Sequence, residues 1–279
     1  MNLVINEATK SQIDRVALNM PQSILIAGPT GIGLSEIINY IADLKKSKPL
    51  IILPEKDEKV DLEKGIIGVE IIRRLYDEVR TKSSSDQLIV IDYTEKMTVQ
   101  AQNAFLKLLE EPTSGVYFIL LSHTGDNLLP TVMSRVTLIS VKPVSIQQSE
   151  LLLDELGVTD QKNRAQILFL AEGLPAEITR LSTNVDYFES RSAIMRDAKT
   201  LLIGTDYEKL RIANKYKDDR NGALLLMTDV ANMLKRSLRA SPDSSSILMI
   251  DKILDVCDKI RANANIRLCI TRVVFSNLL

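Results

Sequence analysis

The sequence predicts an α/β chain in which a parallel-sheet domain precedes two helical segments. Short, fully apolar runs alternate with amphipathic helical patterns over the first half of the chain. These runs lack the apolar–polar alternation of a half-exposed strand, as in strands covered on both faces. Strand patterns stop after Pro143. We therefore expect a sheet of roughly five parallel strands with helices on both faces, followed by helices alone.

The predicted sheet domain covers residues 1–142. Its strands are expected at Ser23–Ala27, Leu50–Leu53, Leu88–Ile91, Val116–Leu121 and Val136–Val141. The helices between them are expected at Ser35–Lys46, Ile66–Thr81 and Thr98–Glu111, with Pro112 closing the last one. In the first of these helices, one buried face is predicted from the spacing of Ile37, Ile38, Ile41 and Leu44.

The rest of the chain has helical patterns only. Residues 143–185 are expected to form a small unit of short helices at Ser149–Leu156, Asn163–Ala171 and Ala176–Ser182. Residues 186–279 are expected to form an all-helical domain, with breaks at Gly204–Asp206, Asp218–Gly222 and Ser241–Ser246. The stretch Ala223–Leu234 contains more apolar residues than one intramolecular face needs, which predicts burial against other subunits.

Composition excludes several classes of protein. The 279 residues carry 35 Lys+Arg against 36 Asp+Glu, which argues against a strongly basic nucleic-acid binder. Aromatic residues make up only 4% of the chain and Trp is absent, which argues against a base-stacking platform for single strands. Two cysteines are too few for a four-cysteine zinc site, and they fit a reducing compartment. Because signal-peptide and membrane-spanning patterns are also absent, we expect a cytoplasmic protein without a membrane partner.

A glycine-rich segment lies between the first predicted strand and the first predicted helix. It reads Gly28-Pro-Thr-Gly-Ile-Gly-Leu-Ser35 and fits the phosphate-loop pattern G-x-x-x-x-G-K-[ST] except that Leu34 replaces the lysine. Gly28, Gly31 and Gly33 would let backbone N–H groups converge on an anion, and Ser35 could hold Mg²⁺. Two interpretations stay open: a turn that binds no ligand, and a weak or vestigial ATP site.

A second part of the nucleotide machinery is incomplete at the end of a predicted buried strand. Asp92 follows Leu88–Ile91, where a Mg²⁺-binding carboxylate of a phosphate-loop enzyme would stand. The next residue is Tyr93 instead of the acid that polarises the attacking water in hydrolysing relatives. Asp92 fits equally well as a cap of the strand end. With the lysine and the acid both missing, we expect no ATP hydrolysis by this chain.

Two further segments carry a family resemblance. The first runs from Asp92-Tyr-Thr-Glu-Lys-Met97 through Asn103-Ala-Phe-Leu-Lys-Leu-Leu-Glu-Glu-Pro112, and the second is Leu128-Leu-Pro-Thr-Val-Met-Ser-Arg-Val136. Together they resemble the bacterial clamp-loader subunits of the AAA+ class. Within that class, the lysine-free phosphate loop resembles the delta-prime family of DNA polymerase III rather than the ATP-hydrolysing gamma/tau family.

The resemblance implies an AAA+ base, a small helical lid and a helical collar that joins sister subunits into a hetero-oligomeric ring. It implies that Arg135, supported by Ser134, reaches in trans as an arginine finger to the ATP of a neighbouring subunit. The implied partners are gamma/tau-type ATPases and the delta subunit, and indirectly a sliding clamp and primed DNA. Relatives often carry a four-cysteine zinc module, but Lys45–Pro49 is a short connection without cysteine, so no zinc is expected.

Other functions and roles are weighed beside this one. An ATP-hydrolysing gamma/tau-type subunit with an unusual phosphate loop is the main alternative, and a standalone nucleic-acid binder is a further one. His123 is the only histidine and is expected to make structural hydrogen bonds. Arg180 is expected to be a solvated charge on its helix. Cys257 and Cys269 are expected to be small buried apolar side chains.

Overall fold

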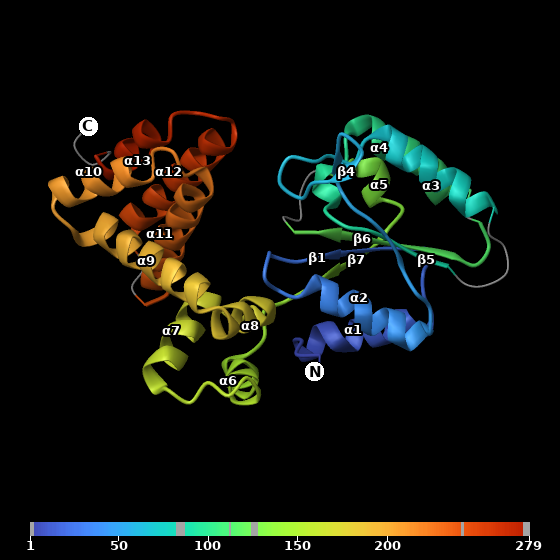
Figure 1. Ribbon diagram of the computed structural model, residues 1–279, viewed down its shortest axis with the longest axis horizontal. Coiled ribbons are helices and arrows are strands. Elements are labelled where there is room, and N and C mark those ends of the chain that lie inside the picture. Colours follow the sequence, from blue (N-terminus) through green and yellow to red (C-terminus); the bar gives the residue numbers. More distant parts are fainter. Residues whose placement is uncertain (1–2, 82–86, 112, 124–127, 241–242, 276–279) are drawn as a thin grey trace. The chain divides into compact units, whose positions relative to one another are not determined.

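The computed structural model describes residues 3–81, 87–111, 113–123, 128–240 and 243–275 (Figure 1). The chain divides into two compact units, Met1–Thr183 and Asn184–Leu279. The predicted sheet domain and the helices that follow it both lie in the first unit, so a separate domain at 143–185 stays a prediction. Among the described residues, no helix is long and apolar enough to cross a membrane.

A parallel sheet forms the centre of the first unit. Over the described residues its strands are β1 (Ser23–Ala27), β2 (Leu50–Ile52), β5 (Gln87–Ile91), β6 (Val116–Ser122) and β7 (Thr137–Ser140), in the spatial order β2-β5-β6-β1-β7. All their pairings are parallel, and in the central register Leu25 faces Leu120 on one side and Leu138 on the other. The sheet class predicted from the apolar runs is confirmed.

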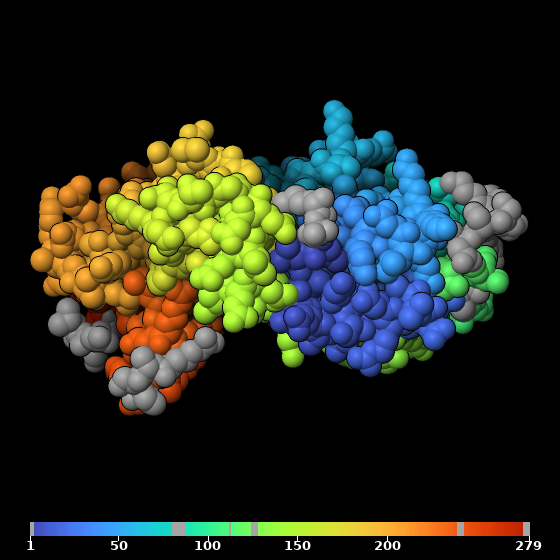
Figure 2. Space-filling view, turned by 90° about the horizontal axis from the view of Figure 1, so that it is seen from below, coloured from blue at the N-terminus to red at the C-terminus, as the bar shows by residue number. Residues whose placement is uncertain are grey.

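Helices cover both faces of this sheet (Figure 1). One face packs against α1 (Glu7–Leu18) and α2 (Leu34–Lys45), whose surfaces lie side by side in Figure 2. The other face packs against α3 (Val69–Thr81) and α4 (Val99–Glu110), with Phe105 of α4 fully buried edge-to-face on Phe118 of β6. Between β6 and β7 lies the short helix α5 (Pro130–Met133). The apolar cores on the two faces hold the sheet in place, and the candidate site lies at the ends of its strands.

Three short helices complete the first unit: α6 (Ile146–Glu155), α7 (Gln161–Ala171) and α8 (Pro175–Thr183). A capping box between Ser145 and Gln148 begins α6. The segment is joined to the sheet layer by backbone hydrogen bonds from Val144 to Gly173 and from Glu177 to Gly31. The second of these bonds brings the start of α8 onto the glycine-rich loop.

The second unit consists of α9 (Val185–Ile203), α10 (Asp206–Lys215), α11 (Arg220–Ala240), α12 (Ser244–Arg261) and α13 (Ile266–Val274) over its described residues. Inside its apolar core, Arg191 of α9 and Asp229 of α11 form a buried bidentate ion pair at 2.9 and 3.0 Å. Because each partner alone would leave an uncompensated buried charge, the pair fixes how α9 and α11 pack. Cys257 and Cys269 are buried, as predicted.

Several predictions need correction. Leu44 was predicted on the inner face of α2, but its side chain is 49% exposed because it lies one turn beyond the sheet contact made by Ile41. The apolar excess of Ala223–Leu234 is buried largely within the second unit, since α9 and α12 both pack against α11. Helix α3 begins at Val69 rather than Ile66, because Ile67 instead pairs as an isolated β-bridge with Met97.

The sequence patterns also missed elements. Helix α1 and the small hairpin β3 (Glu55–Lys56) and β4 (Lys59–Val60) were not predicted. Only Thr9, Ile13 and Ala17 of α1 are buried, which gives too narrow an apolar stripe to recognise. Pro112, predicted to close the helix before β6, lies outside the described residues.

Candidate functional site

The glycine-rich loop connects β1 to α2 and has the shape of a phosphate loop. Gly31 and Gly33 have positive φ angles of 89° and 95°, a backbone conformation that side-chain-bearing residues rarely adopt. Gly33 is the N-cap of α2 and provides no side chain to cap it. The helix N-terminus therefore keeps the geometry that would favour an anion.

Acidic and apolar side chains surround the loop. Leu34, at the position of the expected lysine, is only 3% exposed and packs in the core below the loop. A Cβ placed on Gly31 would lie 3.1 Å from Cβ of Glu177, and one placed on Gly33 would lie 3.3 Å from Oε2 of Glu36. Two carboxylates thus flank the loop where a triphosphate would need a cation.

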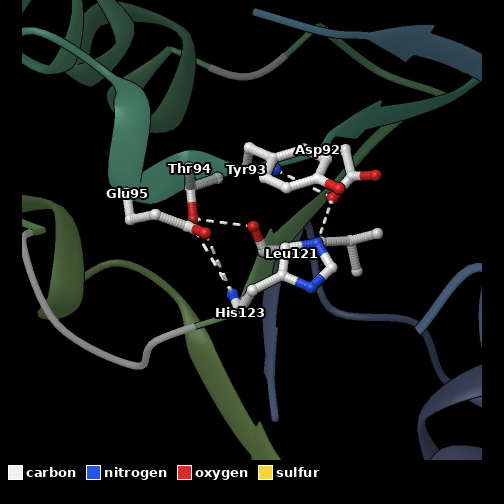
Figure 3. Close-up of polar contacts among 6 residues, drawn as sticks. All are labelled: Asp92, Tyr93, Thr94, Glu95, Leu121 and His123. Atoms are coloured by element: carbon white, nitrogen blue, oxygen red, sulfur yellow. Dashed lines mark hydrogen bonds and ion pairs between the residues drawn. The ribbon is translucent and has the colours of Figure 1, made fainter. Parts of the chain in front are cut away.

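Asp92 directly follows β5, and its carboxylate is hydrogen-bonded to two neighbouring residues (Figure 3). Its Oδ1 accepts hydrogen bonds from the backbone N–H of Tyr93 at 2.8 Å and makes a 2.9 Å contact with Nε2 of His123. The side chains of Asp92 and His123 are only 13% and 15% exposed. A Mg²⁺ ion at Oδ1 of Asp92 would have to replace the imidazole.

Tyr93 covers this pair. Its backbone has a φ of 56°, which is unusual for an aromatic residue, and its ring lies 4.3 Å from the His123 ring, centroid to centroid. Burial, together with the negative charges of Asp92 and Glu95, raises the pKa of the Tyr93 phenol. With this backbone conformation the Tyr93 ring lies against His123.

Glu95 is a residue whose position the sequence did not predict. The 3-10 turn η1 (Thr94–Lys96) brings its carboxylate to the backbone N–H of His123, at 3.3 and 3.4 Å from the two oxygens. The neighbouring Thr94 is fully buried and donates from Oγ1 to the Leu121 carbonyl at 2.9 Å. Spacing along the chain gave no signal for Glu95, because this approach depends on the tight turn after Tyr93.

Residues for a bound Mg-nucleotide are therefore assembled only in part. The structure brings Gly28, Gly31, Gly33 and Ser35 together in one loop and leaves Ser35 exposed. The buried Leu34, the two flanking carboxylates and the His123-bound Asp92 do not fit a Mg²⁺-triphosphate. We therefore derive no step that passes through a nucleotide bound at this loop.

Arg135 lies at a separate corner of the first unit, just after α5. Its Nη1 donates to the carbonyl of Thr131 at 2.9 Å and to Oγ of Ser134 at 3.2 Å. Ser134 in turn donates to the same Thr131 carbonyl at 3.0 Å. The Arg135 side chain is 38% exposed, so its own turn orients it while it stays accessible to solvent. The predicted role of Ser134 in supporting an arginine finger stays a prediction.

Helix α4 holds this corner in place. The buried Gln102 accepts a hydrogen bond from the backbone N–H of Leu129 at 2.7 Å, just before α5 begins. At the other end of α4, Oε1 of Glu110 lies 2.8 Å from Nη2 of Arg135. The Glu110 contact was not anticipated, because sequence periodicity indicates only that Glu110 is on the exposed face of its helix.

Comparison with solved structures agrees with this fold. A crystal structure described as a DNA polymerase III, gamma subunit-related protein from Thermotoga maritima aligns with a TM-score of 0.50 at 20% identity, covering 95% of this chain and 97% of that one. The likeness shows that the two chains share a fold, with a parallel sheet and helices around it.

Comparison of amino-acid sequences gives partial matches to one family. The model of a family described as "DNA polymerase III, delta subunit" matches residues 43–145. DNA polymerase III subunit delta' of Bacillus subtilis is 30% identical over 40% of this chain and 34% of its own length. The same subunit of Pseudomonas aeruginosa is 28% identical over 54% of this chain and 45% of its own length. Part of the chain is thus similar to the DNA polymerase III delta-prime family, and the matches span less than half the length of these relatives.

Proposed function

We propose that this chain is a non-hydrolysing subunit of a replicative clamp loader and that it lends Arg135 to the ATP site of a neighbouring subunit. The observation that carries the proposal is the contrast in charge within the first unit. An oriented, partly exposed arginine lies at one corner, whereas the unit's own phosphate loop has a buried leucine and flanking carboxylates. A permanently charged, planar guanidinium suits γ-phosphate oxygens.

The partners follow from the same proposal. The chain would assemble in the cytoplasm with gamma/tau-type ATPases and a delta subunit, and it would act on a sliding clamp and primed DNA through them. Its own contribution would be a rigid base and the arginine. The delta' names of the matching relatives support this assignment. ATP turnover would belong to the neighbours.

The test is ATP turnover of a loader reconstituted from this chain and the clamp-loader subunits of its own organism, stimulated by clamp and primed DNA. Arginine fingers contribute about 10³- to 10⁵-fold at the site that they complete. Replacing Arg135 by Ala should therefore abolish turnover at that site, and Arg135→Lys should restore little, because an ammonium lacks the planar fork. The exposed Arg73, paired with Glu70 on α3, gives the control variant Arg73→Ala.

Two results would contradict the proposal. Unchanged stimulated turnover in an Arg135→Ala loader that assembles normally would remove the arginine finger. ATP turnover by the isolated wild-type chain would instead favour the gamma/tau-type alternative. Size-exclusion chromatography of each reconstituted loader shows whether the subunits have assembled.

A further inference from the structure

Among the described contacts of Arg135, one reaches a side chain outside the turn that carries the arginine. That side chain is Glu110. The carboxylate belongs to the last residue of α4 and lies 2.8 Å from Nη2, while the contacts of Nη1 all come from Thr131 and Ser134. The guanidinium therefore has one edge fixed by its own turn and a second edge held by a neighbouring helix. Only this second contact can open without disturbing α5.

The position of Glu110 is unfavourable for its own helix. Negative charge at a helix C-terminus opposes the helix dipole, and the next residue, Glu111, adds another carboxylate. Helix stability therefore does not account for an acid at this position. The ion pair with Arg135 does, because it places a compensating cation beside the carboxylate.

The pair is also weak enough to exchange. Glu110 is 50% exposed and Arg135 is 38% exposed, so water screens their attraction. A nucleotide phosphate carries more negative charge and offers several acceptor oxygens to the same guanidinium edge. The turn formed by Thr131 and Ser134 would keep the arginine in place during the exchange.

We propose that Glu110 is a positioning residue that competes with a neighbour's nucleotide for Arg135. In the absence of nucleotide it holds the Nη2 edge, and it gives that edge up when phosphate arrives. This inference rests on the proposed function of Arg135. Only Arg135 that is not paired with Glu110 can bind the phosphate. The apparent affinity for nucleotide is therefore reduced in proportion to the fraction of Arg135 that is unpaired.

The experiment measures the ATP concentration at half-maximal turnover in the reconstituted loader. Glu110→Gln removes the charge at nearly constant shape and should lower that concentration about two- to fivefold, the range expected for one exposed ion pair. Maximal turnover should change less than about twofold, because the arginine itself is intact. Glu110→Ala should give the same shift without an amide that could bond to Arg135. Glu111→Gln, at the next exposed position, should change nothing.

A double-mutant cycle separates this inference from the proposed function. In an Arg135→Ala background, Glu110→Gln should have no further effect. If Arg135→Ala is damaging but Glu110→Gln leaves half-maximal ATP unchanged, or lowers maximal turnover instead, competition by Glu110 is wrong and the arginine finger stands. If Arg135→Ala itself has no effect, the proposed function fails and this inference fails with it.

Discussion

The phosphate loop and the Arg135 corner belong to the same unit but divide the features of an ATP site between them. The loop keeps the backbone geometry, with Gly31 and Gly33 in left-handed conformations, but its surroundings are apolar or negative. The described residues of the corner hold an accessible cation in a defined orientation. Left-handed glycines therefore keep the turn of the loop whatever charge surrounds it, whereas the orientation of Arg135 depends on the turn beneath it.

The largest effect on this contrast is expected from Leu34→Lys, which restores the motif lysine. Because Leu34 is buried, a lysine there must either bury its ammonium group or move its side chain out of the core. We expect either change to lower the free energy of unfolding by about 2–4 kcal/mol. We expect no measurable ATP binding in spite of the restored motif, since Glu36 and Glu177 still flank the loop.

Urea unfolding and fluorescent-nucleotide titration measure these two effects. Leu34→Met keeps the volume without the charge and should cost less than about 1.5 kcal/mol. Tight ATP binding by the Leu34→Lys protein would contradict this view of the loop, because the missing lysine alone would then limit ATP binding there.

A smaller effect is expected at Gly31. Alanine there must adopt a positive φ and would bring its Cβ to 3.1 Å from Cβ of Glu177, so we expect a loss of about 1–3 kcal/mol in the free energy of unfolding. The matched control is Gly157→Ala, because Gly157 has a φ of 72° with nothing within 4 Å of the added Cβ.

The difference between the two glycine variants, measured by urea denaturation, isolates the contact between the loop and α8. Equal losses in the free energy of unfolding would mean that α8 can shift away from the loop at no measurable cost. A larger loss at Gly31 would sharpen the view that the start of α8 is packed firmly against it.

The smallest effect concerns Tyr93 at alkaline pH. Its folded-state pKa is raised, first by burial and then by Asp92 and Glu95, so the folded state binds the phenolic proton more tightly than the unfolded state. Stability from this group is fully present below about pH 10, the ordinary tyrosine pKa, and is lost as pH rises through the folded-state value.

Tyr93→Phe should therefore flatten part of the alkaline decline in urea midpoint. The exposed Tyr207, replaced by Phe, serves as the control because the residue is 71% exposed. An identical decline in the wild type and the Tyr93→Phe variant would show that the ring is not held in the Asp92 cluster in solution.

The outline of the fold could be predicted from sequence because its signals are local. Buried parallel strands need unbroken apolar runs, and β1, β5 and β6 appeared within a residue or two of their observed ends. Loss of the motif lysine and the acid after Asp92 could likewise be recognised by spacing. Helix α1 escaped because its burial depends on packing against α2 and β7 rather than on its own pattern.

The sequence by itself determined the class of fold and the departure of the glycine-rich segment from the phosphate-loop pattern, since each depends on residue type at a fixed spacing. Only the tertiary structure decided which groups meet across long separations along the chain. It paired Asp92 with His123, turned Leu34 into the core, brought Glu177 to the loop and set Glu110 against Arg135. These contacts join different elements, and chain periodicity carries no information about which elements become neighbours.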